Sequence, residues 1–479
     1  MMRLLSTWWN QPAGGREVLR VTLPLMVSTA SWTVMTFIDR LFLFWYSADA
    51  LAASLPGAMV NFLVLCPFLG LAAYVNAFVA QYFGAGKYAR VGPAVWQGMW
   101  LGVLVIPVAL LTNPFAPALF ALIGHEPAVQ AAEVEYFQIL NFGSGAMVLA
   151  GAMSSFFTGR GRVRTVMVVD VTSAAINVVL DYLWIFGYGG FPEWGIAGAA
   201  WATVVALWFK PLVYGVLMAL PEPREVYATL SGWRLDRELM GRLLRYGSPN
   251  SVQMLLEVGS FSLFLMIVGR LGALELTACN LAFTINNLAF MPVYGIGIAT
   301  TTLVGQRLGE NEPDLAARST WSALSIGGAY NAFMAVIYLT CPALLLRLAG
   351  MNLSGVEHAE LERLVVVLLR FVAAYCLFDT MYIIFSSALK GAGDTKFVLL
   401  VTLALAGLPG LGTALGVNVL GFGIFWGWSV LTLWVLLLGV IYLARFLQGA
   451  WRSKRVIEGA SPDEDLPSVE RFAVEAAIE

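Results

Sequence analysis

Long apolar runs separated by short polar turns follow one another along most of the chain. A helix needs about 20 apolar residues to span the hydrocarbon core of a bilayer, and this pattern predicts twelve membrane-spanning helices. Some runs exceed the minimum length, so we expect tilted or bent helices, with kinks at Pro24, Pro67, Pro249, Pro292 and Pro342. The predicted spans are residues 18–44, 50–83, 94–116, 129–156, 164–187, 196–219, 244–269, 275–306, 319–346, 362–388, 397–417 and 421–446.

The two halves of the chain resemble each other at a constant offset of 225 residues, which becomes 232 after a longer loop in the second half. Each half has six predicted spans, an even number, so both halves enter the membrane from the same side. The pattern therefore predicts two bundles related by an axis along the membrane normal, as in many secondary transporters. A duplication that serves folding alone is the alternative. Matching pairs include Pro67 and Pro292, Gly70 and Gly295, Gln81 and Gln306, Gly84 and Gly309, and Gly159 and Gly391.

This organisation predicts an all-α integral membrane protein with two six-helix lobes, at residues 18–220 and 244–447. We expect a cytoplasmic N-terminal segment at 1–17, a cytoplasmic linker at 221–243 and a tail at 448–479, which turns acidic and mobile from Ile457. Lys and Arg concentrate in the two tails and in one set of loops. Because cytoplasmic loops carry an excess of these residues, both termini are predicted to be cytoplasmic, in a multi-pass protein of the plasma (inner) membrane.

The composition narrows the classes of function. Hydrophobic residues make up 59% of the chain and charged residues 12%, against about 25% charged residues in a soluble protein. The net charge of −2 makes nucleic acid an unexpected partner. The four cysteines fit neither a zinc site nor a disulfide framework, so we expect no structural metal and no cofactor. No paired aspartate motif or histidine-rich box suggests an enzyme. The internal repeat is consistent with a monomer surrounded by membrane lipids.

Carboxylates within apolar runs are the strongest chemical signal. Glu257 lies in the apolar segment 251–268, and a charge near the bilayer centre costs about 2.5–3.5 kcal/mol on insertion scales. Gln253 and Glu257 are four residues apart, as are Tyr375 and Asp379, so each pair shares a helix face. Together they predict a cation pocket, because sodium favours oxygen ligands and a buried carboxylate favours its protonated form. Alternatively, each carboxylate pairs with a basic group.

The first half carries a different polar set. Asn177 and Asp181 share one face of span five, and Asp39 lies in the outer part of span one. These charges break the repeat, since Glu257 falls on Trp32 in the first half. We therefore expect a separate polar pocket in the first lobe, which binds a cation, a proton or substrate.

Other residues are weaker candidates. Asp170 lies near one end of span five, where we expect it to be solvated or paired with Arg164. An adaptable substrate cleft is predicted to include Asn286, Phe290, Met291 and Tyr382.

From about residue 18 to 450, the sequence resembles the MATE family (multidrug and toxic compound extrusion), in particular its NorM-like branch. Individually the matching motifs are modest, but together, on twelve spans with a repeat, they are specific. They are Phe37-Ile38-Asp39, Asn177-x-x-x-Asp181, Gln253-x-x-x-Glu257, Val304-Gly305-Gln306-x-Leu308-Gly309-Glu310 and Tyr375-x-x-x-Asp379.

The resemblance implies a V-shaped pair of lobes around a central cleft. It also implies export of amphipathic, often cationic, organic compounds in antiport with sodium or protons. The last position of the span-five motif is often an amide in the family, whereas here it is Asp181. This extra acid leaves the coupling ion open. By resemblance, the cation site comprises Glu257, Tyr375 and Asp379, and the first-lobe polar site comprises Asp39, Asn177 and Asp181.

A flippase or exporter of a lipid-linked precursor is the alternative function, because such proteins belong to the wider superfamily. A pyrophosphate group would require several cationic residues in the cleft. Away from the span ends, only Arg40, Lys210 and Arg370 lie within the predicted spans, and acids prevail near the span centres.

Overall fold

The computed structural model describes residues 8–342, 345–346 and 356–458, and this part of the chain forms helices without strands. Backbone groups that face a bilayer must be satisfied within the segment, so apolar runs of this length fold as helices. In the described residues, eleven helices are long and apolar enough to cross a membrane, or twelve if one bent pair counts as a single span. The prediction of an all-α, multi-span protein is confirmed.

The first half of the chain forms one bundle, the N-lobe. Helix α6 packs against α3, α4 and α8, while α7 packs against α2 and α8. The linker that follows the bundle is attached to it, because Trp96 and Trp100 donate hydrogen bonds to the carbonyl oxygens of Thr229 and Trp233, the latter at 2.9 Å. The elements are α2 (Gly15–Tyr46), α3 (Ala48–Gly84), η1 (Tyr88–Arg90), α4 (Val91–Leu110), η2 (Asn113–Phe115), α5 (Ala116–Ile123), α6 (Pro127–Thr158), α7 (Val163–Phe186), α8 (Ile196–Met218), α9 (Pro221–Val226) and η3 (Ser231–Trp233).

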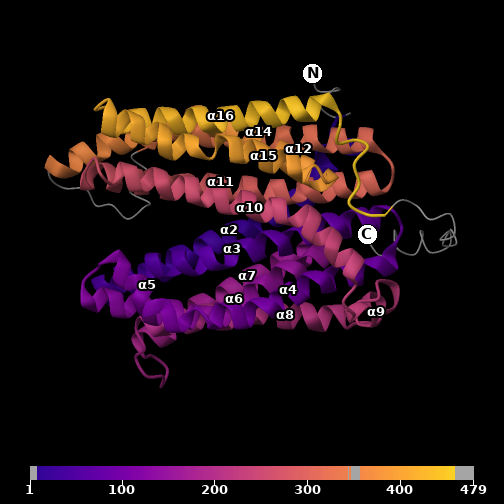
Figure 1. The fold of residues 1–479 in the computed structure, drawn as a ribbon, viewed down its shortest axis with the longest axis horizontal. Coiled ribbons are helices and arrows are strands. Elements are labelled where there is room, and N and C mark those ends of the chain that lie inside the picture. Colours follow the sequence, from indigo (N-terminus) through magenta and orange to yellow (C-terminus); the bar gives the residue numbers. More distant parts are fainter. Residues whose placement is uncertain (1–7, 343–344, 347–355, 459–479) are drawn as a thin grey trace.

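The second half forms the C-lobe and repeats the same packing. Helix α14 takes the place of α6, against α11, α12 and α16, and α10 packs against α15 as α2 packs against α7. In Figure 1 the two lobes lie one above the other, with α2, α3, α10 and α11 between them. The elements are α10 (Arg237–Val268), α11 (Ala273–Gly309), α12 (Pro313–Thr340), α14 (Val356–Ala392), α15 (Thr395–Leu405), η4 (Leu408–Gly412), η5 (Leu415–Val419) and α16 (Ile424–Gln448).

Helix α11 is bent. Its portions Ala273–Asn287 and Ala289–Gly309 meet at 45°. Pro292 lies one turn beyond the bend, where its missing amide hydrogen removes a hydrogen bond to the preceding turn and its ring crowds that turn. The prediction of a kink at Pro292 agrees with this geometry.

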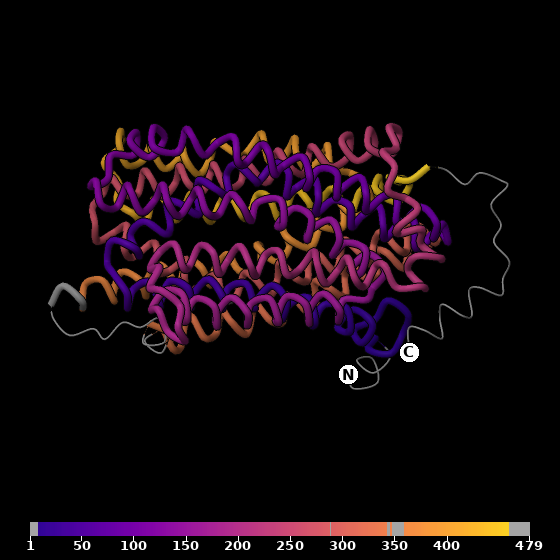
Figure 2. The backbone as a smooth tube through the Cα atoms, turned by 90° about the horizontal axis from the view of Figure 1, so that it is seen from below, coloured from indigo at the N-terminus to yellow at the C-terminus, as the bar shows by residue number. Residues whose placement is uncertain are grey.

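The lobes meet through α2 and α3 of the N-lobe and α10 and α11 of the C-lobe. Two hydrogen bonds of the same kind cross between them. Gln81 Nε2 donates to the Gly391 carbonyl oxygen at 2.8 Å, and Gln306 Nε2 donates to the Gly159 carbonyl oxygen at 2.8 Å. Because these residues are equivalent in the repeat, we call the two bonds the glutamine clamp. They lie at the end of the molecule where α2 begins and where the chain leaves α16, here named the terminal end (Figures 1 and 2).

Glycines permit the close approach at the clamp. A Cβ atom on Gly84 would lie 2.0 Å from the Gln306 carbonyl oxygen, and one on Gly309 would lie 2.3 Å from the Gln81 carbonyl oxygen. Both distances are far shorter than a van der Waals contact. The glycine and glutamine pairs that mark the repeat in the sequence therefore form the contact between the lobes.

Candidate functional site

The C-lobe carboxylate Glu257 accepts two hydrogen bonds at one oxygen. Gln253 Nε2, one turn earlier on α10, donates to Glu257 Oε1 at 2.7 Å, and the Tyr382 hydroxyl on α14 donates to the same atom at 2.5 Å. Gln253 is buried, and its Oε1 atom has no hydrogen-bond partner among the described residues. The helix spacing predicted that Gln253 and Glu257 share one face of this helix, and the hydrogen bond between them agrees with that prediction. The sequence placed Tyr382 only in a general substrate cleft.

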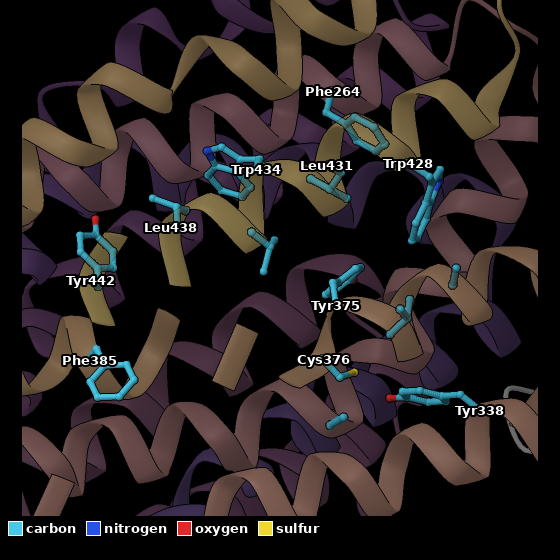
Figure 3. Packing of buried hydrophobic residues seen from close by; sticks show 14 of the residues in the cluster. Phe264, Tyr338, Tyr375, Cys376, Phe385, Trp428, Leu431, Trp434, Leu438 and Tyr442 are labelled. Carbon is cyan, nitrogen blue, oxygen red and sulfur yellow. The ribbon is translucent and has the colours of Figure 1, made fainter. Parts of the chain in front are cut away.

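Asp379 and Tyr375 occupy different surroundings on α14. Tyr375 is buried in the apolar core of the C-lobe, near Cys376 (Figure 3). Asp379 is partly exposed and makes no hydrogen bond to Glu257 within the described structure. It lies three residues before Tyr382 and therefore on the same side of α14. The residue whose phenol contacts Glu257 is thus Tyr382 rather than Tyr375.

A second layer holds Tyr382 in place. Its ring stacks on Tyr442 of α16, with centroids 6.0 Å apart and an interplanar angle of 26°. The Tyr442 hydroxyl donates to the Val398 carbonyl oxygen at 3.0 Å and lies 3.0 Å from Thr402 Oγ1. Four helices, α10, α14, α15 and α16, thereby fix the orientation of the phenol on Glu257.

In the N-lobe, Asp39, Asn177 and Asp181 form one contiguous buried cluster. With the Asn177 amide nitrogen turned toward the acids, it donates to Asp39 Oδ1 at 2.8 Å and to Asp181 Oδ2 at 3.2 Å. The two carboxyl groups are also within hydrogen-bonding reach of each other. Asp181 Oδ1 is buried and has no partner among the described residues. The structure therefore brings together the three residues that were predicted from the sequence to form a polar pocket in the first lobe.

No described lysine or arginine forms a salt bridge with the four acids of the two polar sites, which are Glu257, Asp379, Asp39 and Asp181. Oxygen atoms supply all the candidate ligands, and within the described residues no group of three or more His, Cys, Asp or Glu side chains could hold a metal ion.

Asp170 is the exception, and the expected pairing with Arg164 is wrong. Lys210 Nζ on α8 lies 3.0 Å from Asp170 Oδ1, and the hydroxyl of Ser28 on α2 hydrogen-bonds the other carboxylate oxygen. The Lys210 ammonium also lies 5.7 Å from the ring centroid of Trp32. The sequence contained both charges, but no helix spacing links Asp170 on α7 to Lys210 on α8.

The remaining cleft candidates lie on α11. The rings of Phe290 and Tyr294 stack at 6.3 Å with an interplanar angle of 22°. The carbonyl oxygen of Met291 accepts a hydrogen bond from Thr29 Oγ1 of the N-lobe at 2.8 Å. Asn286 is partly exposed. Of these three candidates, Met291 contributes a backbone contact between the lobes.

Comparisons with known proteins agree with this architecture. The family model described as MatE matches residues 24–183 and 249–414. The chain is 29% identical over 403 residues to "Multidrug resistance protein NorM" of Burkholderia vietnamiensis, covering 84% of this chain and 86% of that protein. It is 30% identical over 391 residues to "Probable multidrug resistance protein NorM" of Bradyrhizobium diazoefficiens, covering 80% and 82%.

Solved structures share the fold. One is described as "Outward-facing conformation of a multidrug resistance MATE family transporter of the MOP superfamily", with a TM-score of 0.84 at 18% identity over 94% of this chain and 99% of that chain. Another is "Crystal structure of eukaryotic MATE transporter AtDTX14", with a TM-score of 0.81 at 19% identity over 91% and 96%. The predicted V-shaped arrangement of two six-helix lobes is confirmed.

Proposed function

The chain belongs to the MatE family of membrane transporters, and we propose that it exports amphipathic, cationic organic compounds in antiport with sodium ions or protons. One observation carries the proposal. Glu257 and Asp379 lie within membrane-spanning helices and form no salt bridge with a described basic side chain, while Gln253 and Tyr382 orient the Glu257 carboxylate. Paired or neutralised carboxylates are far less costly in a membrane than free ones, so this site is suited to an exchangeable cation.

The C-lobe acids would take either the coupling ion or the cationic substrate. A ligand shifts a conformational equilibrium only when its affinity differs between the two states. Entry of a cation at Glu257 and Asp379 would cancel the negative charge that retains an organic cation, so the substrate would leave. Gln253 Oε1, which is buried without a described partner, offers a further oxygen ligand.

The N-lobe cluster would act as a proton site. Two carboxyl groups in contact cannot both ionise without strong repulsion, so one proton shared between Asp39 and Asp181 is favoured. The Asn177 amide donates to both carboxyl groups. We propose that protonation here accompanies cation binding in the C-lobe.

We propose that the terminal end faces the cytoplasm, because basic residues concentrate there. With the glutamine clamp closed at this end, the conformation would be outward-facing. The in-span basic residues argue against a flippase for lipid-linked precursors. Lys210 is paired with Asp170, while Arg40 and Arg370 are exposed, so these three residues offer no cluster that could hold a pyrophosphate group.

The test is ethidium efflux from inverted or reconstituted vesicles, with the sodium and proton gradients imposed separately. We expect Glu257→Gln and Asp379→Asn each to lower gradient-driven efflux at least about tenfold, because removal of a charged ligand costs on the order of 1.4 kcal/mol or more. Glu312→Gln, at an exposed acid between α11 and α12, is the matched control. Full efflux by both site variants would exclude the proposed cation site.

A further inference from the structure

The chain after α16 folds back across the terminal end. Gly449 has a φ of 74°, a left-handed conformation that glycine tolerates and that turns the chain. Trp451 follows and is 1% exposed. Its ring stacks on Phe446 with centroids 4.8 Å apart, and its Nε1 donates to the Phe446 carbonyl oxygen at 2.8 Å. The segment therefore starts from a fixed point on the C-lobe.

Val456 joins this segment to the glutamine clamp. Its side chain is 1% exposed and belongs to an apolar cluster that N-lobe residues such as Phe78 form with Leu243 of α10 and Ala299 of α11. Its backbone nitrogen donates to Gln81 Oε1 at 2.9 Å, while Gln81 Nε2 donates to the Gly391 carbonyl oxygen. One amide side chain thus connects α3, the turn after α14 and the C-terminal segment.

Glu458 anchors the segment on basic side chains. Its carboxylate lies 3.3 Å from Arg90 Nε and also pairs with Arg242, and the Tyr82 hydroxyl donates to it at 2.7 Å. Burial raises the pKa of Glu458, but the hydrogen bonds from Arg242, from its own backbone amide and from Tyr82, together with the charge of Arg242, outweigh that effect and lower the pKa to about 2. The carboxylate consequently remains ionised at physiological pH. Ile457 packs against the same apolar cluster, so this residue is part of the packed structure and not, as expected, of a mobile tail.

The same segment holds the C-lobe. Lys454 pairs with the buried Asp394, which Arg445 also contacts at 2.9 Å. Arg452 Nη1 lies 2.9 Å from Asp314 Oδ1 at the start of α12. Residues 451–458 therefore bridge the two lobes on the side of the closed contact.

We propose that residues 451–458 form a latch that holds the terminal end closed and must leave the N-lobe before that end can open. This inference rests on the alternating access implied by the proposed transport function. The latch is attached to the C-lobe by Trp451, the Lys454–Asp394 pair and the pairing of Glu458 with Arg242 of α10. Release from the N-lobe therefore occurs at Gln81, Tyr82 and Arg90. The latch breaks the symmetry of the repeat, because it binds Gln81 and not the equivalent glutamine of the clamp, Gln306.

The experiment measures the opening of the terminal end directly, without substrate or ion gradient, so its result does not depend on the proposed antiport. Spin labels are placed through Arg164→Cys and Lys396→Cys, which are exposed, equivalent positions at the starts of α7 and α15. The four natural cysteines are first replaced by alanine. Double electron–electron resonance in nanodiscs then gives the ratio of open to closed distances.

A chain that ends at Glu458 keeps the latch and should match the full chain. A chain that ends at Ser453 should raise the open-to-closed ratio about tenfold or more, because it loses charge-assisted hydrogen bonds. An unchanged ratio after truncation at Ser453 overturns the proposal. Equal opening of the chain that ends at Glu458 also overturns it. Should the shorter chain fail to fold, Val456→Pro and Glu458→Gln in the full chain remove the backbone donor and the charge separately, and unchanged ratios in both overturn the latch.

Discussion

At the scale of single residues, the direction of hydrogen bonds decides what each acid can do. The amide of Gln253 and the phenol of Tyr382 both donate to Glu257 Oε1. Among the described residues, Oε2 receives no such donor, so it is the oxygen open to a cation or a proton. Asp170 differs, because Lys210 and Ser28 bind one carboxylate oxygen each. Both oxygens of Asp170 thus have a partner, whereas Glu257 keeps one oxygen without a described donor.

The Asp170–Lys210 pair makes a prediction about stability. Lys210→Met should lower the free energy of unfolding by about 3 kcal/mol, because it leaves a largely buried carboxylate without its cationic partner. The thermal midpoint in detergent should fall accordingly. The double variant Asp170→Asn, Lys210→Met should recover most of this loss. A double-mutant cycle of unfolding midpoints measures the coupling. Additive effects of the two single substitutions would show that the pair contributes nothing.

At this scale, only part of the site could be predicted from the sequence. Helix periodicity predicted that Gln253 and Glu257 lie near each other, since residues four apart share a face. The contact between Tyr382 and Glu257 could not follow, because it depends on how α14 is rotated against α10. The Asp170–Lys210 pair escaped prediction for the same reason. Contacts within one helix can be predicted from sequence spacing, whereas contacts between two helices depend on how the helices pack.

At the scale of elements, helices α3 and α11 are shaped by their contact with the other lobe. Gly84 and Gly309 lie at the ends of these helices, where each meets a backbone carbonyl of the opposite glutamine. The bilayer allows little besides helices, so the sequence predicted the spans well. The attachment of the linker after α8 to α4 could not be predicted. Hydrogen bonds from an indole to a backbone carbonyl, such as Trp100 to Trp233, produce no periodic pattern in the sequence.

The glycine contacts predict opposite signs for similar substitutions. Gly84→Ala and Gly309→Ala should each destabilise the closed terminal end by about 1–3 kcal/mol, because the new Cβ would overlap a carbonyl oxygen. Gly241→Ala in α10 has open space around the new atom, so it should stabilise the helix by up to about 1 kcal/mol. Thermal unfolding in detergent compares the three. Stability of Gly84→Ala equal to that of Gly241→Ala would contradict the close approach.

At the scale of the whole molecule, the repeat builds one interface from two equivalent halves. Each lobe presents a glutamine to a glycine carbonyl of the other, and a further contact joins Asn76 to Thr302 at 3.0 Å. The sequence predicted the repeat and the two lobes. Their shared contact could not be predicted, since it arises from the relative placement of the bundles.

The latch makes the two halves of the clamp unequal, and this inequality is measurable. Gln81→Leu removes bonds to both Gly391 and Val456, whereas Gln306→Leu removes the bond to Gly159. Hydrogen–deuterium exchange of peptides that cover residues 76–90 and 301–312 should therefore rise more in Gln81→Leu, by several-fold, because each lost bond weakens closure by about 1 kcal/mol. Equal exchange in the two variants would show that Val456 adds no closure.

The glutamine clamp also has an electrical consequence. Amide donors and carbonyl acceptors carry no net charge, so breaking both bonds moves no charge through the membrane field. Moving one elementary charge across the full field is worth about 2.3 kcal/mol per 100 mV. The clamp can thus open without electrical work. Ions that reach carboxylates such as Glu257 do carry charge through the field, so we expect the voltage dependence of transport to fall in a Glu257→Gln variant.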